Sequence, residues 1–317
     1  MHVLTGYSTR PASMKDAGLV AELIRVSDAA EEADPAAGID DVIEHWQRPG
    51  LDLESDTALV FAQDGRIAGF ADAWDTSEDD VIDGDAEVHP DQRGHGIGAF
   101  LVSFLIRRAT EMARSHASKR SRLRNYISSR DEGAAALLSA TGFEVIRHFF
   151  HMHIDLSEGV EPPVWPAGVH VRTMNRGTDE EVVHRVVEEA FAEHWGRPSV
   201  PFDAFVKGFL GRSDFDPTLW FLACEGDDVV GVLYAAIRDG KRPWVNDLGV
   251  LPKARKRGIG LALLLHAFAE FTRRGFSSAA LNVDASNATG ATRLYERAGM
   301  KMQRRFDCYE KVVSVDG

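Results

Sequence analysis

Residues 252–260 read Pro252-Lys-Ala-Arg255-Lys-Arg-Gly258-Ile259-Gly260, and they repeat an earlier stretch, Pro90-Asp-Gln-Arg93-Gly-His-Gly96-Ile97-Gly98. Both stretches fit P-x-x-R-x-x-G-I-G, and the second begins 162 residues after the first (252 − 90). The same offset relates Gly69 to Gly231. A constant offset over so long a span indicates a duplicated domain. A glycine-rich turn that opens a helix favours phosphate binding, because its backbone N–H groups and the helix dipole attract anions.

The size of the chain agrees with this duplication. Its 317 residues, 44% of them hydrophobic, are enough for two domains with separate cores. We expect domains at 1–155 and 169–317, joined by a linker at 156–168 that is rich in proline and glycine. No apolar run is long enough to span a membrane, and the N-terminus lacks an apolar signal region. The two cysteines, Cys224 and Cys308, have no metal-ligand or disulfide spacing, so a cytoplasmic protein without a metal is expected.

Charge is distributed unevenly along the chain. The net charge is −13, and between Asp28 and Asp91 there are 20 acidic residues and two basic ones, Arg48 and Arg66. This distribution argues against nucleic acid as a partner, because its phosphates would be repelled. It favours a cationic substrate or partner, or else a solvated acidic surface that aids solubility.

The two halves show the same order of elements. In the second half, Asp179–Glu193 has the apolar stripe of a helix, and a loop near 194–198 precedes a second helical stretch near Phe202–Leu210. The other expected elements are strands at Val169–Thr173, Leu219–Cys224, Val229–Ala236, Trp244–Val250, Ala279–Val283 and Phe306–Val313, with helices at Leu261–Arg273 and Thr289–Ala298. Strands and helices do not alternate strictly, so we predict an α+β fold with one mixed sheet in each half.

The glycine loop alone fits neither the dinucleotide-binding fingerprint nor the lysine-containing nucleotide P-loop. The second copy is more specific, because Val250-x-Pro252-x-x-Arg255-x-x-Gly258-Ile-Gly260 is followed by a second motif. This motif is Asn287-Ala-Thr-Gly-Ala-Thr-Arg-Leu294-Tyr295-Glu-Arg-Ala-Gly299-Met300. Together the two motifs resemble the GNAT superfamily of acetyl-CoA-dependent acetyltransferases. The resemblance covers both halves, so the chain is similar to tandem GNAT proteins.

The resemblance implies roles for individual residues of the second half. The backbone amides of the loop would bind the pyrophosphate of acetyl-CoA; these belong to Arg255, Lys256, Arg257, Gly258, Ile259 and Gly260. The preceding strand would open at a bulge, so that the backbones of Leu248 and Val250 pair with the pantetheine arm. The Leu248 N–H would polarise the thioester carbonyl. Asn287 would fix the pantetheine, and Tyr295 would protonate the departing thiolate. The alternative for Tyr295 is an aromatic side chain packed in the core.

The general base and the acceptor site are less defined. Trp244 and Asn246 are expected on the face of the strand that lines the acceptor, whereas alternation would turn Asp247 to the opposite face. Related tandem enzymes would carry a carboxylate at about Trp244, so its absence argues against their reaction. Glu193 and His194 are further candidates for the base, and Asn246 would orient a water. His194 and Trp195 are also expected to line the acceptor site, with surface or packing roles as the alternative.

The first half keeps the loop residues Arg93, Gly96 and Gly98 but lacks the second motif. Leu138 stands in the place of Tyr295, and Arg130 stands in the place of Asn287. Ile82 and Gly84 are expected on the acceptor face of its strand, where they offer no base. We therefore predict that residues 1–155 are catalytically silent, with the binding of acetyl-CoA left open. His148, His151 and His153 are expected on a strand rather than around a metal.

These inferences lead to an expected function. The chain would be an acetyl-CoA-dependent N-acetyltransferase that acts on a primary amine of a small molecule or peptide, by direct attack in a ternary complex. The alternative is a non-catalytic acyl-CoA-binding or regulatory module. We expect a monomer or homodimer that binds neither nucleic acid nor membrane.

Overall fold

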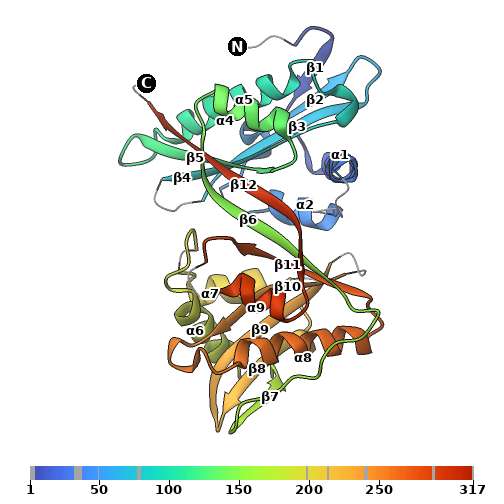
Figure 1. Ribbon diagram of the computed structural model, residues 1–317. Coiled ribbons are helices and arrows are strands. Elements are labelled where there is room, and N and C mark those ends of the chain that lie inside the picture. Colours follow the sequence, from blue (N-terminus) through green and yellow to red (C-terminus); the bar gives the residue numbers. More distant parts are fainter. Residues whose placement is uncertain are drawn as a thin grey trace. The chain divides into compact units, whose positions relative to one another are not determined.

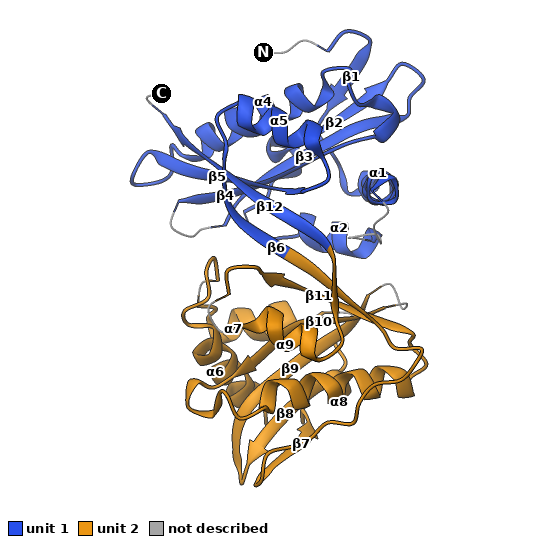
Figure 2. Cartoon of the chain, in the orientation of Figure 1, with its two compact units in different colours: residues 1–149, 304–317 blue, residues 150–303 orange. Residues whose placement is uncertain are grey.

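The structure, a computed structural model, describes residues 4–31, 38–48, 50–76, 80–197, 199–212, 214–238, 242–287 and 290–315. The chain divides into two compact units (Figure 1, Figure 2). Unit 1 comprises Met1–Phe149 and Arg304–Gly317, and unit 2 comprises Phe150–Gln303. Each unit contains a mixed sheet with helices, which confirms the α+β class. Of the residues in predicted elements, Pro198, Ala288 and Thr289 lie outside the described residues.

The sheet of unit 1 has the strand order β1-β2-β3-β4-β5-β12. Among the described residues of this sheet, β4 and β5 pair in parallel, and the pairs β1–β2, β2–β3, β3–β4 and β5–β12 are antiparallel. Its elements are β1 (Tyr7–Arg10), η1 (Met14–Asp16), α1 (Ala17–Ala30), α2 (Ile39–Trp46), α3 (Leu53–Asp56), β2 (Thr57–Ala62), β3 (Ile67–Asp75), β4 (Val81–Val88), η2 (Pro90–Gln92), α4 (Ile97–Met112), β5 (Arg120–Ser128), α5 (Glu132–Ala140) and the first part of β6 (Glu144–Asp155).

The sheet of unit 2 has the order β6-β11-β10-β9-β8-β7, with β10 and β11 parallel. Its elements are β7 (Val169–Thr173), α6 (Glu180–Phe191), α7 (Phe202–Phe205), η3 (Val206–Leu210), η4 (Pro217–Leu219), β8 (Trp220–Glu225), β9 (Asp228–Arg238), β10 (Arg242–Val250), η5 (Pro252–Ala254), α8 (Ile259–Arg273), β11 (Ser278–Asp284), α9 (Ala291–Arg297) and the start of β12 (Lys301–Ser314). The predicted stripe on α6 is confirmed, since Val183, Val186 and Val187 are buried.

The duplication is visible in the packing of one helix on each sheet. A Cβ atom built on Gly231 would lie 3.3 Å from Ile259 Cγ2 and 3.2 Å from Leu263 Cδ1 of α8. The corresponding atom on Gly69 would lie 2.8 Å from Ile97 Cγ2 of α4. Both contacts are tighter than ordinary van der Waals packing, so only glycine lets the helix approach the strand this closely. The repeat therefore preserves a contact between helix and sheet as well as a motif.

The division into units departs from the linear domains 1–155 and 169–317. Strand β12 pairs with β5 from Phe306↔Ser128 to Ser314↔Arg120, although β12 is the last strand of the second sequence repeat. Tyr309 and Val313 join the core of unit 1, and Arg304 binds Asp28 and Glu31 at 2.6 and 2.5 Å. The second part of β6 places Met152 and Ile154 in the core of unit 2. Each repeat thus contributes its last strand to the other repeat's sheet.

Among the described residues, no helix combines the length and apolar character that crossing a membrane requires.

The exchanged strand generates a test of the fold. We expect residues 1–155 alone to lack a cooperative unfolding transition, because β5 would lose its partner strand and the core would lose Tyr309 and Val313. Residues 1–149 joined through a flexible linker to residues 304–315 should unfold cooperatively in urea, followed by circular dichroism. Equally cooperative transitions in the two fragments would contradict the exchange.

Candidate functional site

The loop between β10 and α8 has the conformation that its glycines indicate. Gly258 precedes α8 with a φ of +90°, and Gly96 precedes α4 with a φ of +84°. Lys256 also has a positive φ, +61°, which is uncommon for a residue with a side chain. The left-handed turn brings the chain directly into α8, whose first N–H groups have no carbonyl partner within the helix. These groups, together with the helix dipole, form a site that attracts an anion.

The basic residues of this loop divide into two groups. The Arg255 guanidinium donates hydrogen bonds to the carbonyls of Val250 (3.1 Å) and Ala190 (2.9 Å), which ties the loop to β10 and α6. Arg257 forms an ion pair with Glu225 at 2.7 Å. Lys253 and Lys256 are exposed. Arg255 therefore shapes the loop, and the lysines supply accessible positive charge.

Gly260 connects the loop to the second motif. A Cβ atom on Gly260 would lie 2.9 Å from Leu294 Cδ1, so α9 packs directly against the first turn of α8. In unit 1 the Cβ atom of Gly98 would lie 3.2 Å from Leu137 Cδ2 of α5. Tyr295 follows Leu294 in the sequence, and Leu138 follows Leu137. The packing agrees with the sequence alignment that set Leu138 in the place of Tyr295.

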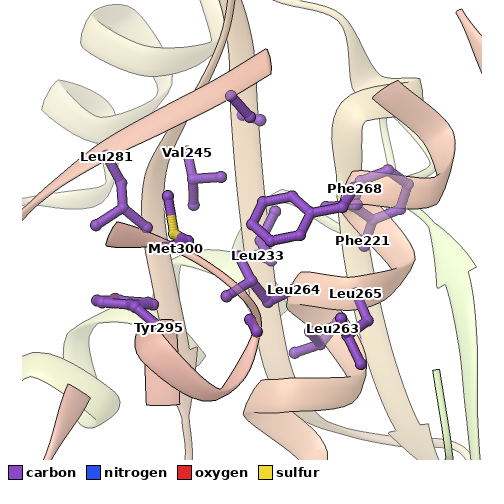
Figure 3. Close-up of a cluster of buried hydrophobic side chains, with 14 of the residues drawn as sticks. Phe221, Leu233, Val245, Leu263, Leu264, Leu265, Phe268, Leu281, Tyr295 and Met300 are labelled. Atoms are coloured by element: carbon purple, nitrogen blue, oxygen red, sulfur yellow. The ribbon is translucent and has the colours of Figure 1, made fainter. Parts of the chain in front are cut away.

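Tyr295 belongs to the buried cluster that includes Val245, Leu281 and Met300 (Figure 3). Its side chain is 8% exposed. Burial, and after it the carboxylate of Asp247, raises the pKa of Tyr295 well above its ordinary value. The phenol is therefore protonated at neutral pH.

Asn287 lies in the turn before α9. Its N–H donates to the carbonyl of Asp284 (3.1 Å), and its carbonyl accepts from Gly290 N–H (3.2 Å). Gly290 has a φ of +75° and begins the helix that carries Tyr295. The backbone of Asn287 thus helps to fix the start of α9.

Strand β10 contains a bulge. Its register against β9 shifts between Val245 and Asp247, and Asn246 in the bulge is exposed. Trp244 faces Ala236 and Asp247 faces Tyr234 across the strand pair, so Trp244 and Asp247 share one face. The prediction that Asp247 points to the opposite face is therefore wrong, because the extra residue interrupts the alternation.

β10 and β11 also separate at this position. Among the described residues they pair in parallel only at Trp244↔Ala280. Leu248 and Val250 lie on the part of β10 beyond this pair, next to the core of unit 2. Bulge and separation together leave backbone groups of β10 available to an extended ligand.

Asp247 is held by two residues that the sequence analysis did not identify. Arg197 binds its Oδ1 at 2.5 Å and its Oδ2 at 2.7 Å, and the Tyr234 hydroxyl donates to Oδ2. The Arg197 guanidinium also lies 4.0 Å from the centre of the Phe191 ring. Burial disfavours the charged form of Arg197, but its hydrogen bonds to Asp247 outweigh this and raise the pKa of the guanidinium. Burial, with Asp247 next in importance, raises the pKa of Tyr234 well above its usual value.

The predicted acceptor residues lie in two places. The ring of His194 bonds to the Trp195 carbonyl through Nδ1 at 3.0 Å, in the loop after α6 that Arg197 joins to β10. Glu193 is exposed in the same loop. Trp244 is buried, with the Arg238 guanidinium 3.7 Å from its ring centre and the His151 ring 5.3 Å away. The structure brings His194 and Trp195 to the loop near Asp247, and it packs Trp244 against other residues.

The corresponding loop of unit 1 is more acidic. Arg93 lies 3.4 Å from Asp131 and 3.6 Å from Glu31, and Arg130 donates to the Glu31 carbonyl at 2.8 Å. β4 separates from β5 after Asp83↔Arg124, and there the Asn125 amide donates to the Gly84 carbonyl at 2.6 Å. In unit 1, side chains therefore contact the loop arginine and the strand backbone. The corresponding positions in unit 2 have a basic loop and the backbone of β10.

Ile82 and Gly84 are not on an open face of unit 1. Ile82 is fully buried in the core, and a Cβ atom on Gly84 would lie 3.0 Å from Leu105 of α4. Their expected position on an acceptor face is wrong, because β4 keeps an unbroken register and turns Asp83 and Asp85 to that face instead.

The histidines at the end of the first repeat make separate contacts. His148 bonds to Asp307 at 2.7 Å, and His151 bonds to Asn282 at 3.1 Å. Within the part of the chain that the structure describes, no group of three metal-ligating side chains is present.

Comparison with known proteins gives a consistent picture. The profile of the "Acetyltransferase (GNAT) family" matches residues 23–143 and again 182–300. A mycothiol acetyltransferase of Streptomyces griseus is 31% identical over 76% of this chain and 75% of its own. One of Geodermatophilus obscurus is 30% identical over 92% and 93%.

Solved structures show the same fold over nearly the whole chain. A GCN5-related N-acetyltransferase from Sphaerobacter thermophilus has a TM-score of 0.85 and 32% identity, covering 99% of this chain and 98% of that one. A tandem GNAT protein from the clavulanic acid biosynthesis pathway has a TM-score of 0.70 at 18% identity, with 96% and 98% covered. The second likeness concerns the fold alone.

The Asp247 cluster generates a stability prediction. We expect Arg197→Met to lower the free energy of unfolding by about 3 kcal/mol, because it leaves a largely buried carboxylate without its cation. Arg66→Met, which removes an exposed pair with Asp64, should cost less than about 1 kcal/mol. Urea unfolding of both variants measures the difference. Equal losses would show that Asp247 is as well solvated as a surface residue.

Proposed function

Because the chain belongs to the acetyltransferase (GNAT) family, we propose that it transfers an acetyl group from acetyl-CoA to a primary amine of a small molecule or peptide. The family makes it an acyltransferase, and the finer assignment places the reaction in unit 2. One observation carries this assignment. The basic loop before α8 and the protonated Tyr295 on α9 belong to the same unit and are joined by the contact of Gly260 with Leu294.

Acetyl-CoA would supply the thioester when bound. The amides from Arg255 to Gly260 would bind its pyrophosphate, with Lys253 and Lys256 adding charge. The backbones of Leu248 and Val250 would pair with the pantetheine arm, and Asn287 would hold one side of that arm. The left-handed Gly258 and the separation of β10 from β11 support this fit, because the first turns the chain into the N-terminus of α8 and the second ends the pairing of β10 with β11.

The transfer would proceed by direct attack. The nitrogen of the acceptor amine forms a bond to the thioester carbonyl carbon, and the carbon–sulfur bond breaks. The Leu248 N–H would stabilise the negative oxygen of the intermediate, and Tyr295 would give its proton to the departing thiolate. The proton lost by the amine would pass to a water beside the exposed Asn246. Cys224 is buried in β8, which argues against a covalent acetyl-enzyme.

Asp247 has a positioning role in this proposal. Both of its oxygens accept hydrogen bonds from Arg197, and one also accepts from Tyr234, so it is poorly suited to take a proton from the amine. These bonds join the loop after α6 to the bulged strand. They would hold Leu248 in register with the thioester, with His194 and Trp195 lining the acceptor.

Unit 1 is proposed to be catalytically silent. Leu138 replaces the proton donor, and Asn125 already bonds to the Gly84 carbonyl where β4 and β5 separate. Arg93 faces two carboxylates, so its loop is poorly suited to a pyrophosphate.

A second candidate acceptor is the one implied by the name of the relatives, mycothiol acetyltransferase, at about 30% identity. Trp244 counts against it, because those enzymes would carry a carboxylate at about this position. Here Trp244 is buried beside Arg238 and His151. We therefore propose a different amine as the acceptor.

Removal of the Tyr295 hydroxyl tests the catalytic assignment. We expect Tyr295→Phe to lower kcat by about 10²–10⁴-fold while leaving the affinity for acetyl-CoA unchanged, because the lost group acts on the leaving thiolate alone. Tyr309→Phe is the matched control, since Tyr309 is equally buried but lies in unit 1. Release of free thiol during turnover over a panel of amines is the measurement. An unchanged kcat in Tyr295→Phe would assign Tyr295 to the core alone.

Substitutions at left-handed glycines test the binding site. Gly258→Asp should weaken acetyl-CoA binding roughly tenfold or more, because it sets a carboxylate beside the pyrophosphate and strains the loop. Gly96→Asp should have little effect if unit 2 alone binds. Gly168→Asp controls for backbone strain, since Gly168 has a φ of +78° in the segment between the repeats. Calorimetric titration measures the affinities, and equal losses at Gly96 and Gly258 would overturn the single-site assignment.

A further inference from the structure

One face of the strand pair β3–β4 in unit 1 carries four carboxyl groups. Asp83, Asp85 and Glu87 alternate along β4, and Asp85 lies directly opposite Asp72 of β3. These four residues are called the acidic face. The side chain of Asp85 is exposed, so the face is open to solvent.

Asp72 lacks a partner for one of its oxygens. The side chain is nearly fully buried, and its Oδ2 bonds to His45 Nε2 at 2.9 Å. Its Oδ1 has no hydrogen-bond partner among the residues that the structure describes, and neither has Oδ1 of Asp83. A buried carboxylate oxygen left without a donor is costly, and such oxygens are usually satisfied. The enclosed oxygen therefore adds negative charge behind the exposed Asp85 that no donor of the described residues offsets.

Unit 2 shows what fills this place in the other repeat. Asp72↔Asp85 is the counterpart of Tyr234↔Asp247 at the offset of 162 residues. There, Arg197 neutralises the carboxylate with two hydrogen bonds, and a tyrosine replaces the second acid. In unit 1, two acids face each other, and Asp72 is in contact with His45.

Other charges around the acidic face do not balance it. Arg48 lies over the Trp74 ring at 5.6 Å, and Arg124 is paired with Glu310 at 2.9 Å. Asp28 and Glu31, the acids near Glu87, are paired with Arg304. The cations that act on these four carboxyl groups are His45, Arg48 and Arg124, and Arg124 is shared with Glu310.

Three of these carboxyl groups have raised pKa values, and burial is the largest cause in each. Burial raises the pKa of Asp83 to about 6 and that of Glu87 to about 7. Asp85 reaches solvent but is surrounded by protein on its other sides, and this desolvation, followed by the Asp72 carboxylate, raises its pKa above the usual range. Each group keeps a proton that an ordinary surface carboxyl would have lost, and a bound cation would release it.

We propose that the acidic face of unit 1 binds a small organic cation that carries two or more amine groups. Alternate residues on a strand are about 7 Å apart, which is comparable to the spacing of nitrogens in a linear aliphatic polyamine. Ammonium groups can pair with the exposed Asp85 carboxylate and offset the negative charge of Asp72 opposite it. A metal ion fits less well, because the described residues contain no group arranged as metal ligands. This proposal does not depend on which amine unit 2 acetylates.

The test is a calorimetric titration of the full chain with spermidine, above the raised pKa values and at low ionic strength. We expect one binding event, weakened roughly tenfold or more by Asp85→Asn and by Asp72→Asn, because each removes a charge that faces the ligand. Asp64→Asn is the control, since Asp64 is an exposed acid of unit 1 paired with Arg66. It should bind spermidine like the wild type.

A second measurement keeps the proposal testable if Asp72→Asn does not fold, because it uses the exposed Asp85 instead. Without ligand, the exposed Asp85→Asn change should raise the unfolding temperature at alkaline pH, because it relieves repulsion from Asp72. Raised pKa values mean that the folded protein binds more protons, so stability falls as pH rises from about 4 to about 7, and Asp85→Asn should flatten this fall.

Three outcomes would overturn the proposal. They are the absence of spermidine binding, binding that Asp64→Asn weakens as much as Asp85→Asn does, and binding of Ca²⁺ at these residues without spermidine.

Discussion

The close approach of α8 to the sheet of unit 2 is the constraint on which the candidate site depends. Gly231 lets Ile259 and Leu263 contact the strand, and Gly260 lets Leu294 contact the first turn of the helix. A side chain at either glycine would push α8 away from the strand or from α9. The loop amides and Tyr295 would then lose their common frame. Gly258 completes the arrangement, because its left-handed backbone turns the chain directly into the helix.

The two repeats keep this frame and differ in where they place charge. Unit 2 has a basic loop before α8, and its buried acid, Asp247, is paired with Arg197. Unit 1 has a loop arginine held by acids, and its buried acid, Asp72, has one oxygen that accepts from no donor among the residues described. The two copies therefore share a backbone but differ in local charge, which is the difference on which the two proposed binding sites rest.

Motif spacing predicted the fold class, the family resemblance and the order of elements, because a turn of fixed length before a helix is a local property. It did not predict the exchange of last strands, since the pairing of Phe306 with Ser128 joins residues far apart in sequence. It also missed Arg197 and Tyr234. Arg197 stood in a predicted loop, but a loop cation reveals its partner only when the strand register is known. The face of Asp247 was wrong for a related reason: alternation was applied across a bulge, and one extra residue reverses it.

That single residue also separates the two copies. In β10 the shift at Asn246 sets Trp244 opposite Ala236 and leaves Asn246 exposed. In β4 the register is unbroken, so Asp83 takes the place opposite Trp74, and Asp83, Asp85 and Glu87 form one row. A bulge in β4 would move Asp83 out of this row, and a straight β10 would remove the exposed Asn246. The bulge therefore produces the exposed Asn246 of the proposed site in unit 2, and its absence produces a row of carboxylates in unit 1. The same site cannot provide both, because a strand has one register.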